Sequence, residues 1–296
     1  MIKNFTFNCL RKNFLKAFLL ACFFAFQTLA QQIDAIWGVN RSASNTNGNI
    51  FTMSTSGSNY TIMKEFKYVN SDGDDPFGNN MLLGPDGFLY GITSEGGYDG
   101  YGNFFKIKPD GSGYKILKEL QYYVDGGYIY GKLLKASDGF LYAITYEGGE
   151  YDYGTIIRFG WDGKTTKLHD FTQEEGGYTY ASLVEGPDGY LYGTTYEEGL
   201  HGEGTLFKIT KDGSDFKVLH QFGKDNDGGY PYFNDPVFIG NKLYGMTYSG
   251  GYDGNGTIYR INTNGSGYEK IYDFISSDNN PYYPYSPLYK GSDNFI

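Results

Sequence analysis

The sequence predicts an all-β protein of four-stranded antiparallel units, and three observations support that fold class. The first is glycine: 44 Gly in 296 residues disfavour long helices, where each Gly costs about 1 kcal/mol relative to Ala. The second is the aromatic content, 31 Tyr and 23 Phe, which excludes a disordered chain. The third is an internal repeat of 50 to 52 residues, whose segments read as short strands separated by turns.

Two strands of the repeat, which we call A and B, are the clearest. Strand A carries Leu-Tyr-Gly or Leu-Tyr-Ala and begins at Leu89, Leu141, Leu191 and Leu243. Strand B follows a Gly-rich loop, and its copies are residues 102–107, 154–159, 204–209 and 256–261, with a weaker copy at 48–53. A turn ending in Gly, such as Asp110-Gly111, follows each copy of strand B. These dipeptides predict hairpins, because Gly tolerates positive φ.

Strands C and D complete the unit. Strand C, such as residues 114–120, alternates apolar with polar residues, and strand D is a short apolar run such as residues 81–83. The copies of strand C end in Phe66, Leu120, Phe171, Phe222 and Phe274. Ile36-Trp37-Gly38 opens a degenerate first repeat. Because four strands in about 50 residues are typical of one blade, we predict a β-propeller over residues 31–296, with five repeats and a sixth truncated within residues 292–296.

The N-terminus has the pattern of a secretory signal. Residues 1–30 hold four cations and no acid, followed by an apolar run over residues 17–26 and then Thr28-Leu29-Ala30. The run is shorter than the ~20 residues that span a bilayer, so we predict cleavage after Ala30. A lipoprotein signal at Cys22 is the less favoured alternative, because the apolar run continues past that residue. The protein is therefore expected to be secreted or held at the cell surface.

Removal of residues 1–30 changes the charge and the cysteine count. The formal net charge falls from −10 to −14 when the four cations are lost, and Cys9 and Cys22 leave with the signal. A chain this acidic disfavours nucleic acid as a partner. The mature chain has no disulfide and no thiol nucleophile. No later stretch is apolar enough for membrane insertion.

The repeat resembles a known family. The best copy reads Leu191-Tyr192-Gly193-Thr194-Thr195, then residues 204–209 as Gly-Thr-Leu-Phe-Lys-Ile, then residues 219–222 as Leu-His-Gln-Phe. This pattern is similar to the GloVer tandem repeat of secreted bacterial proteins, and the likeness spans about residues 33–296. The resemblance implies an exported propeller, and the family has no general activity that it would carry over. Kelch repeats are the second resemblance, on Gly96-Gly97 after strand A.

The A–B and C–D loops are expected to share one face, because connections in a propeller alternate between two faces. Repeated tyrosines and acids in these loops form our candidate ligand site, in which Tyr supplies flat apolar area and the acids accept hydrogen bonds. Its A–B residues are Glu95, Tyr98, Asp99, Glu147, Tyr151, Asp152, Glu197, Tyr252 and Asp253. Its C–D residues are Tyr128, Tyr130, Tyr178, Tyr180, Tyr230 and Tyr232. Packing between blades is the competing interpretation, favoured for the C–D tyrosines and evenly weighted for the A–B loops.

Metal-binding and catalytic signals are weaker. Asp72, Asp74 and Asp75 offer oxygen ligands for Ca²⁺, but they do not fit the twelve-residue calcium loop, so no cofactor is the first expectation. His169 and His220 occupy one repeat position and are interpreted as structural. No nucleophile elbow or zinc spacing is present, and no catalytic residue is assigned. The acid pair of a glycosidase is not excluded, because it needs only two acids at the right separation, and a sequence does not show that separation.

We therefore expect a non-catalytic propeller that binds a polysaccharide or an extracellular protein through its Tyr/Gly/Asp-rich loop face. The alternatives are an extracellular glycoside hydrolase or polysaccharide lyase, which would need one loop to break the repeat around an acid pair, and a purely structural scaffold without any ligand.

Overall fold

A computed structural model describes residues 35–41, 47–67, 72–76, 80–224, 226–276 and 283–291. The predicted signal at residues 1–30, with Cys9 and Cys22, lies outside the described residues, as does the truncated sixth copy at residues 292–296. The described chain divides into two compact units. The smaller includes residues 51–61, and the larger comprises residues 38–50 together with everything from residue 62 onward.

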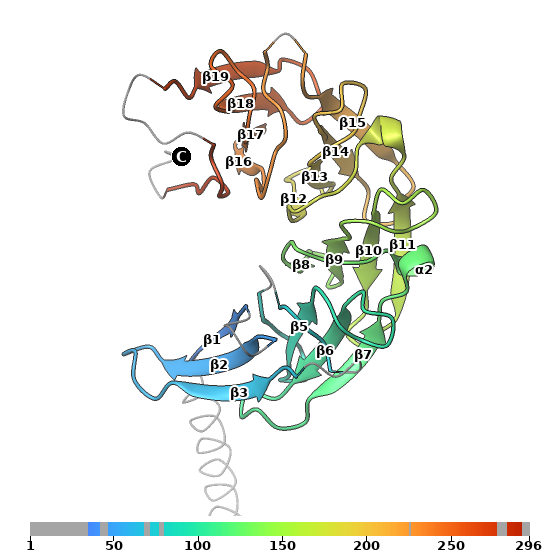
Figure 1. Cartoon of the computed structure of the whole chain (residues 1–296), viewed down its shortest axis with the longest axis vertical. Helices are drawn as coiled ribbons and strands as arrows, with labels where there is room; N and C mark the ends of the chain where they lie inside the picture. Colours follow the sequence, from blue (N-terminus) through green and yellow to red (C-terminus); the bar gives the residue numbers. More distant parts are fainter. Residues whose placement is uncertain are drawn as a thin grey trace, which may run out of the picture. The chain divides into compact units, whose positions relative to one another are not determined.

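The large unit contains four antiparallel sheets of four strands, each built as predicted from strands D, A, B and C in that order (Figure 1). The strands of the first two sheets are β4 (Leu82–Leu83), β5 (Leu89–Thr93), β6 (Asn103–Ile107) and β7 (Lys115–Glu119), then β8 (Leu134–Lys135), β9 (Leu141–Ile144), β10 (Thr155–Phe159) and β11 (Thr165–Asp170). Those of the next two are β12 (Val184–Glu185), β13 (Leu191–Thr195), β14 (Thr205–Ile209) and β15 (Phe216–Gln221), then β16 (Val237–Ile239), β17 (Lys242–Thr247), β18 (Thr257–Asn262) and β19 (Glu269–Asp273).

The degenerate first repeat forms a sheet of three strands rather than four. Its strands are β1 (Ala35–Asn40), β2 (Asn49–Ser54) and β3 (Thr61–Glu65). The described helical segments are one turn each, α2 (Tyr122–Asp125) and η1 (Gln173–Glu175), and both lie in C–D loops. Among the described residues, no helix has the length and apolar character needed to cross a membrane.

The Leu-Tyr-Gly sequence of strand A has a steric reason. Gly91 pairs with Phe105, and Gly193 pairs with Phe207. A Cβ atom at either glycine would lie 2.7 or 2.6 Å from the Cζ atom of that phenylalanine. Glycine therefore lets the aromatic ring of strand B lie over strand A. The pairing of strand B with strand C shifts register just before that ring, between Phe104 and Phe105 and again between Leu206 and Phe207.

Successive sheets of the large unit pack face to face through apolar cores. The first core joins β5 and β6 to β9 and β10 through fully buried residues such as Phe104 and Phe159. Equivalent clusters join the second sheet to the third and the third to the fourth. The large side chains that end strand C belong to these interfaces, since Phe171 contacts Phe207 and Phe222 contacts Tyr259 at 5.2 Å between ring centroids. Each buried ring contributes about 1.5–3 kcal/mol.

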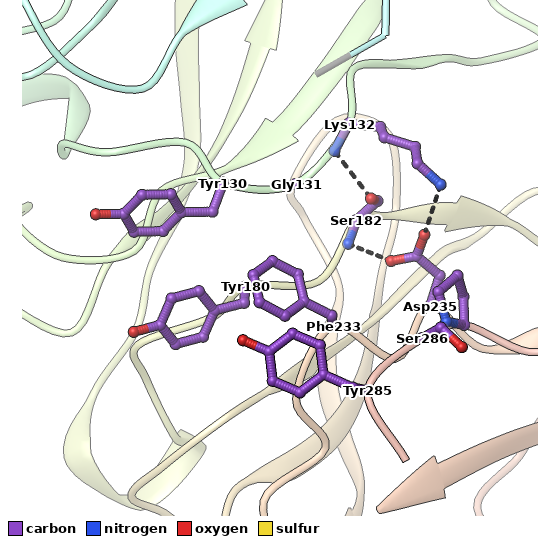
Figure 2. Close-up of a pocket in the computed structure, with 10 residues that line it drawn as sticks. Tyr130, Gly131, Lys132, Tyr180, Ser182, Phe233, Asp235, Tyr285 and Ser286 are labelled. Carbon is purple, nitrogen blue, oxygen red and sulfur yellow. Dashed lines mark hydrogen bonds and ion pairs between the residues drawn. The ribbon is translucent and has the colours of Figure 1, made fainter. Parts of the chain in front are cut away.

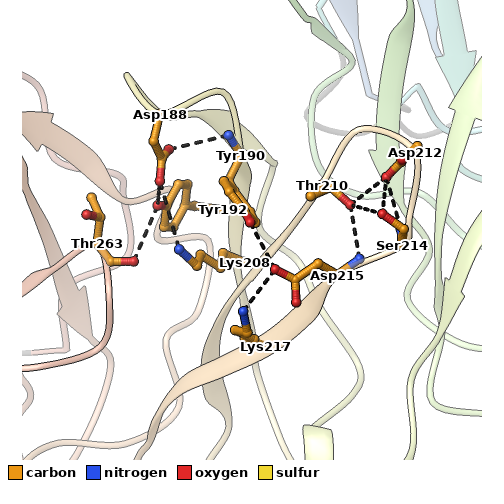
Figure 3. A network of polar contacts seen from close by, with 10 residues as sticks. All are labelled: Asp188, Tyr190, Tyr192, Lys208, Thr210, Asp212, Ser214, Asp215, Lys217 and Thr263. Carbon is orange, nitrogen blue, oxygen red and sulfur yellow. Dashed lines mark hydrogen bonds and ion pairs between the residues drawn. The ribbon is translucent and has the colours of Figure 1, made fainter.

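The tyrosine of strand A is a buried structural residue. Tyr90, Tyr142 and Tyr192 are at most 1% exposed. Each hydroxyl donates a hydrogen bond to the aspartate of the preceding D–A turn, with O···O distances of 2.8, 2.6 and 2.7 Å to Asp86, Asp138 and Asp188. Figure 3 shows this contact at Tyr192, beside a second network in which Asp212 fixes the B–C turn through Thr210 and Ser214. The D–A turns are thus tied to the core.

Candidate functional site

The long loops of neighbouring repeats meet. The C–D loop that leaves one sheet forms a single β-bridge with the A–B loop of the next. These bridges join Asp74 to Glu95, Gly127 to Glu147, Gly177 to Glu197 and Gly229 to Ser249. They place the C–D tyrosines beside the A–B acids.

Buried threonines anchor both loops to the sheet. Thr205, at the start of β14, lies against Thr195 of β13 at 3.0 Å between the two hydroxyls. The Thr205 hydroxyl also donates to the carbonyl of Glu175 in the C–D loop at 2.7 Å. Thr145 and Thr155 repeat this pairing one repeat earlier. Because these hydrogen bonds are buried, losing one leaves an unsatisfied polar group that costs about 1–3 kcal/mol.

A basic side chain and an acid fix the C–D loop to strand C in four repeats. The pairs are Lys64–Asp72, Lys118–Asp125, His169–Glu175 and His220–Asp227, with N···O distances of 2.6, 2.7, 3.1 and 2.7 Å. His169 and His220 thus occupy a position that Lys fills elsewhere. Their rings also stack on Phe216 and Tyr268 at 3.8 and 3.7 Å between centroids. This geometry supports the structural interpretation of both histidines.

Seven tyrosines from the loops form a continuous row of touching rings, which we call the tyrosine belt. Its members are Tyr130, Tyr146, Tyr180, Tyr196, Tyr232, Tyr248 and Tyr285. Neighbouring centroids along the belt lie between 4.9 and 6.4 Å apart. Tyr285 was not among the predicted site residues, nor were Tyr146, Tyr196 and Tyr248, which lie one or two positions after strand A. The repetition of the latter three every 50 to 52 residues is the signal that identifies them.

Four further tyrosines flank the belt in a strained backbone conformation. Tyr128, Tyr178, Tyr230 and Tyr283 have φ of 58°, 54°, 53° and 57°. This left-handed conformation is uncommon for any residue with a Cβ atom and is unfavourable for a bulky one, at a cost of roughly 1–2 kcal/mol. The ring of Tyr178 lies 5.5 Å from Tyr146, and that of Tyr230 lies 5.4 Å from Tyr196. We call these four residues the αL tyrosines.

Three glutamates run beside the belt and form the glutamate row. Glu95, Glu147 and Glu197 occupy one repeat position and are partly buried. Burial raises the pKa of all three carboxyl groups. The charges of Asp75 and Asp74 raise the pKa of Glu95 further, as Asp152 does for Glu147 and Glu198 for Glu197. Burial and the Glu95 carboxylate also raise the pKa of Tyr130 to about 12. The row therefore makes the belt electronegative.

The predicted residues at the tips of the A–B loops lie apart from the belt. Tyr98 and Tyr252 are each 81% exposed and Tyr151 is 50% exposed. The backbone amides of Tyr98 and Tyr252 donate to Glu119 and Asp273, so these tips fold toward strand C. The acids of the tips are Asp99, which is exposed, Asp152, which accepts from Tyr122 at 2.5 Å, and Asp253, which accepts from the Ser276 amide. The predicted site thus separates into a belt group and a tip group.

A pocket of about 270 Å³ opens at the belt (Figure 2). Its aromatic walls are Tyr130, Tyr180, Phe233 and Tyr285, and its polar residues are Lys132, Ser182 and Asp235. Tyr130 and Tyr180 stack at 5.2 Å, and Phe233 lies 5.1 Å from Tyr180. The sequence did not identify Lys132, Ser182 or Asp235, because each is a different residue type. Their common place, two residues before the start of β8, β12 or β16, is the signal that finds them.

The three candidate calcium ligands are held by other contacts. Asp72 pairs with Lys64, and Asp75 pairs with Arg41 at 3.0 Å. Asp74 accepts a hydrogen bond from the backbone amide of Asp75. Within the described residues, no group of three or more His, Cys, Asp or Glu side chains is arranged to hold a metal ion. Asp75 occupies the αL tyrosine position in the first repeat, with φ of 46°.

The repeat matches one family model over residues 24–237 and again over 77–296. The chain belongs to the Gloeobacter/Verrucomicrobia repeat family. This match confirms the resemblance identified from the sequence. No curated protein matches the chain.

The chain is similar to several solved structures at low sequence identity. A GH74 enzyme of Niastella koreensis is 12% identical, with a TM-score of 0.56 over 82% of this chain and 37% of that chain. TolB from Acinetobacter baumannii is 14% identical, with a TM-score of 0.47 over 81% of this chain and 52% of that one. A chain of a nidogen–laminin complex is 13% identical, with a TM-score of 0.48 over 86% and 81%. This chain thus spans about half the length of TolB. The likeness to the GH74 enzyme is one of fold alone.

Proposed function

We propose that the chain is an exported, non-catalytic β-propeller whose tyrosine belt and glutamate row bind a carbohydrate chain. The observation that carries this proposal is the belt itself, seven rings in contact along consecutive repeats. A run of ring faces offers flat apolar area to the C–H faces of successive sugars, and the phenol hydroxyls and carboxylates offer partners for sugar hydroxyls.

Backbone strain in the αL tyrosines supports a role for their rings beyond packing. Glycine would adopt φ near +55° without penalty, whereas tyrosine stands there four times. Strained conformations are retained where the surrounding structure and function hold them. Tyr283 is still 42% exposed, so burial of its ring does not account for the residue. A role of the exposed ring in ligand binding would account for a tyrosine at this strained position.

The glutamate row supports the proposal and narrows the ligand. Carboxylates with a raised pKa are less stable when ionised in the folded chain than in water. They are therefore a cost to the fold at neutral pH, as groups held for function often are. Their charge repels acidic polysaccharides and leaves neutral ones unaffected. We therefore place neutral polysaccharides first among the ligands and extracellular proteins second.

A binding panel tests the proposal directly. Affinity electrophoresis in gels containing a β-glucan, xylan, mannan or starch should show retardation in at least one neutral polysaccharide, and none in polygalacturonate. Tyr196→Ala should weaken that binding at least tenfold, because it removes the central ring of the belt. Tyr190→Ala is the matched control, because Tyr190 lies in the D–A turn and bonds Asp215. Absence of binding by the unmodified chain to every polysaccharide would overturn the proposal. Release of reducing sugar in the same panel would favour the hydrolase alternative.

A further inference from the structure

The pocket at the belt is assembled from one position in successive repeats. Gly131-Lys132, Ala181-Ser182 and Asn234-Asp235 each precede a strand D by the same number of residues, and Asn80 holds the corresponding place before β4. An aromatic residue stands two positions earlier at three of these four places, as Tyr130, Tyr180 and Phe233, whereas the polar residue differs at every place. A constant ring beside a changing polar group is the arrangement expected where the ring supplies area and the polar group supplies selectivity.

Hydrogen bonds between repeats hold the polar residues in place. The backbone amide of Lys132 donates to the Ser182 hydroxyl at 2.9 Å, and the amide of Ser182 donates to Asp235 Oδ1 at 2.6 Å. The second carboxylate oxygen, Oδ2, lies 3.6 Å from Lys132 Nζ. That distance is longer than the 2.7–2.9 Å of a charge-assisted hydrogen bond. The ammonium and carboxylate therefore form an ion pair that is longer than a direct hydrogen bond, and Figure 2 marks this contact with a dashed line.

We propose that this pocket is a subsite for one neutral sugar ring, recognised through adjacent hydroxyls that bridge Lys132 and Asp235. This inference rests on the proposed carbohydrate function and names its selective position. One hydroxyl accepts from the Lys132 ammonium and its neighbour donates to Asp235 Oδ2. The sugar lies against Tyr180 and Phe233, which form the aromatic wall. A volume of about 270 Å³ is at the small end of ligand sites, which suits a single ring rather than an oligomer.

The same groups disfavour other ligands. An apolar molecule would remove water from an ion pair without replacing its hydrogen bonds, which is costly. An anion would be attracted by Lys132 but repelled by Asp235, and a cation would be attracted by Asp235 but repelled by Lys132. A zwitterion such as a free amino acid would have to separate Lys132 from Asp235 in order to pair with both, whereas two adjacent hydroxyls can bridge the two groups as they stand. A neutral polyol remains the best match.

Isothermal titration with monosaccharides tests the subsite. The probes are glucose, galactose, mannose and xylose, with 2-deoxyglucose, glucuronic acid and glycine as comparisons. We expect at least one neutral sugar to bind. Lys132→Met and Asp235→Asn should each weaken that binding at least tenfold, because each removes one side of the hydroxyl bridge. Asp235→Asn keeps an oxygen that can accept from the Ser182 amide, so the fold is expected to survive.

Matched variants separate this inference from the proposed function. Lys164→Met and Asp162→Asn remove an exposed pair of the same types, 3.2 Å apart, in a B–C turn, and should leave sugar binding unchanged. If the unmodified chain binds a polysaccharide, and Lys132→Met and Asp235→Asn leave that binding unchanged, the subsite is overturned but the proposed function is not. Glycine or glucuronic acid binding more tightly than every neutral sugar also overturns it. If the unmodified chain binds no polysaccharide, the proposed function itself is overturned.

Discussion

Two sets of tyrosines recur once per repeat in this chain, and they differ in what surrounds them. Tyr142 and Tyr192 of strand A are fully buried and hydrogen-bonded to turn aspartates. Tyr180 and Tyr232 of the C–D loops are partly exposed and touch mainly other aromatic rings. Periodicity is the same for both sets. Recurrence alone therefore does not separate a packing residue from a binding residue, whereas burial and hydrogen bonding do.

The largest expected effect falls on the buried set. Tyr192→Ala should lower the free energy of unfolding by about 3–5 kcal/mol, because it removes a fully buried ring from the core between the third and fourth sheets. Tyr192→Phe should lower it by about 1 kcal/mol, since only the hydroxyl is lost, with its short hydrogen bond to Asp188 and its longer one to the Thr263 carbonyl. Urea denaturation measures both. If Tyr180→Ala proved as costly as Tyr192→Ala, the two sets would be equivalent and the belt would be packing.

The αL tyrosines should behave in the opposite way. Tyr178→Asn exchanges a strained residue for one that tolerates positive φ, and the relief of roughly 1 kcal/mol offsets the lost ring contacts. We expect stability within about 1 kcal/mol of the unmodified chain and polysaccharide binding at least tenfold weaker. Urea denaturation measures the stability, and affinity electrophoresis measures the polysaccharide binding. Unchanged binding would remove this residue from the site.

The His–acid pairs give an intermediate effect that depends on pH. His169→Lys should be tolerated, because Lys118 fills that position in another repeat, whereas His169→Ala should cost about 1 kcal/mol. Burial acts to raise the pKa of Glu175, but the hydrogen bond and charge of His169 and two hydrogen bonds from Thr172 together outweigh it and lower the pKa below its ordinary 4.5. The contribution of Glu175 is therefore complete above pH 4.5 and lost as pH falls further. In Glu175→Gln, the melting temperature should therefore decline less steeply as the pH falls below 4.5. If the variant and the unmodified chain lose melting temperature equally over that range, this prediction is contradicted.

The smallest effect concerns the glutamate row. The raised pKa of Glu197 means that the folded chain holds its proton more tightly than the unfolded chain. Its cost to stability is absent below pH 4.5 and complete above the raised pKa. Because the group is only partly buried and solvent screens its charge, Glu197→Gln should raise the free energy of unfolding at pH 7 by only about 0.5 kcal/mol, with no gain at pH 4. Thermal unfolding at both pH values tests this, and a loss of stability at pH 7 would refute it.

The sequence predicts the sheets well because the repeat fixes their strands locally. The Leu-Tyr-Gly start of strand A, the Asp-Gly turns and the order D, A, B, C all follow from residues a few positions apart. The candidate site is predicted only in part. Tyr98 and Tyr128 belong to equally repetitive loops, but the hydrogen bond from the Tyr98 amide to Glu119 turns its tip toward strand C. That contact joins positions 21 residues apart, and the pocket joins residues more than 100 apart.

The hydrogen bond from the amide of Ser182 to Asp235 has a consequence for how such a chain can change over generations. Its donor is a main-chain amide, which every residue except proline possesses, and its acceptor comes from the following unit. A duplicated unit thus brings a donor for the unit that follows it, and it brings an acceptor for the unit before it where its own residue is one that accepts, as Ser182 and Asp235 do and Lys132 does not. The number of repeats can therefore grow by whole units, while a change of one residue per unit alters the polar group beside the aromatic rings.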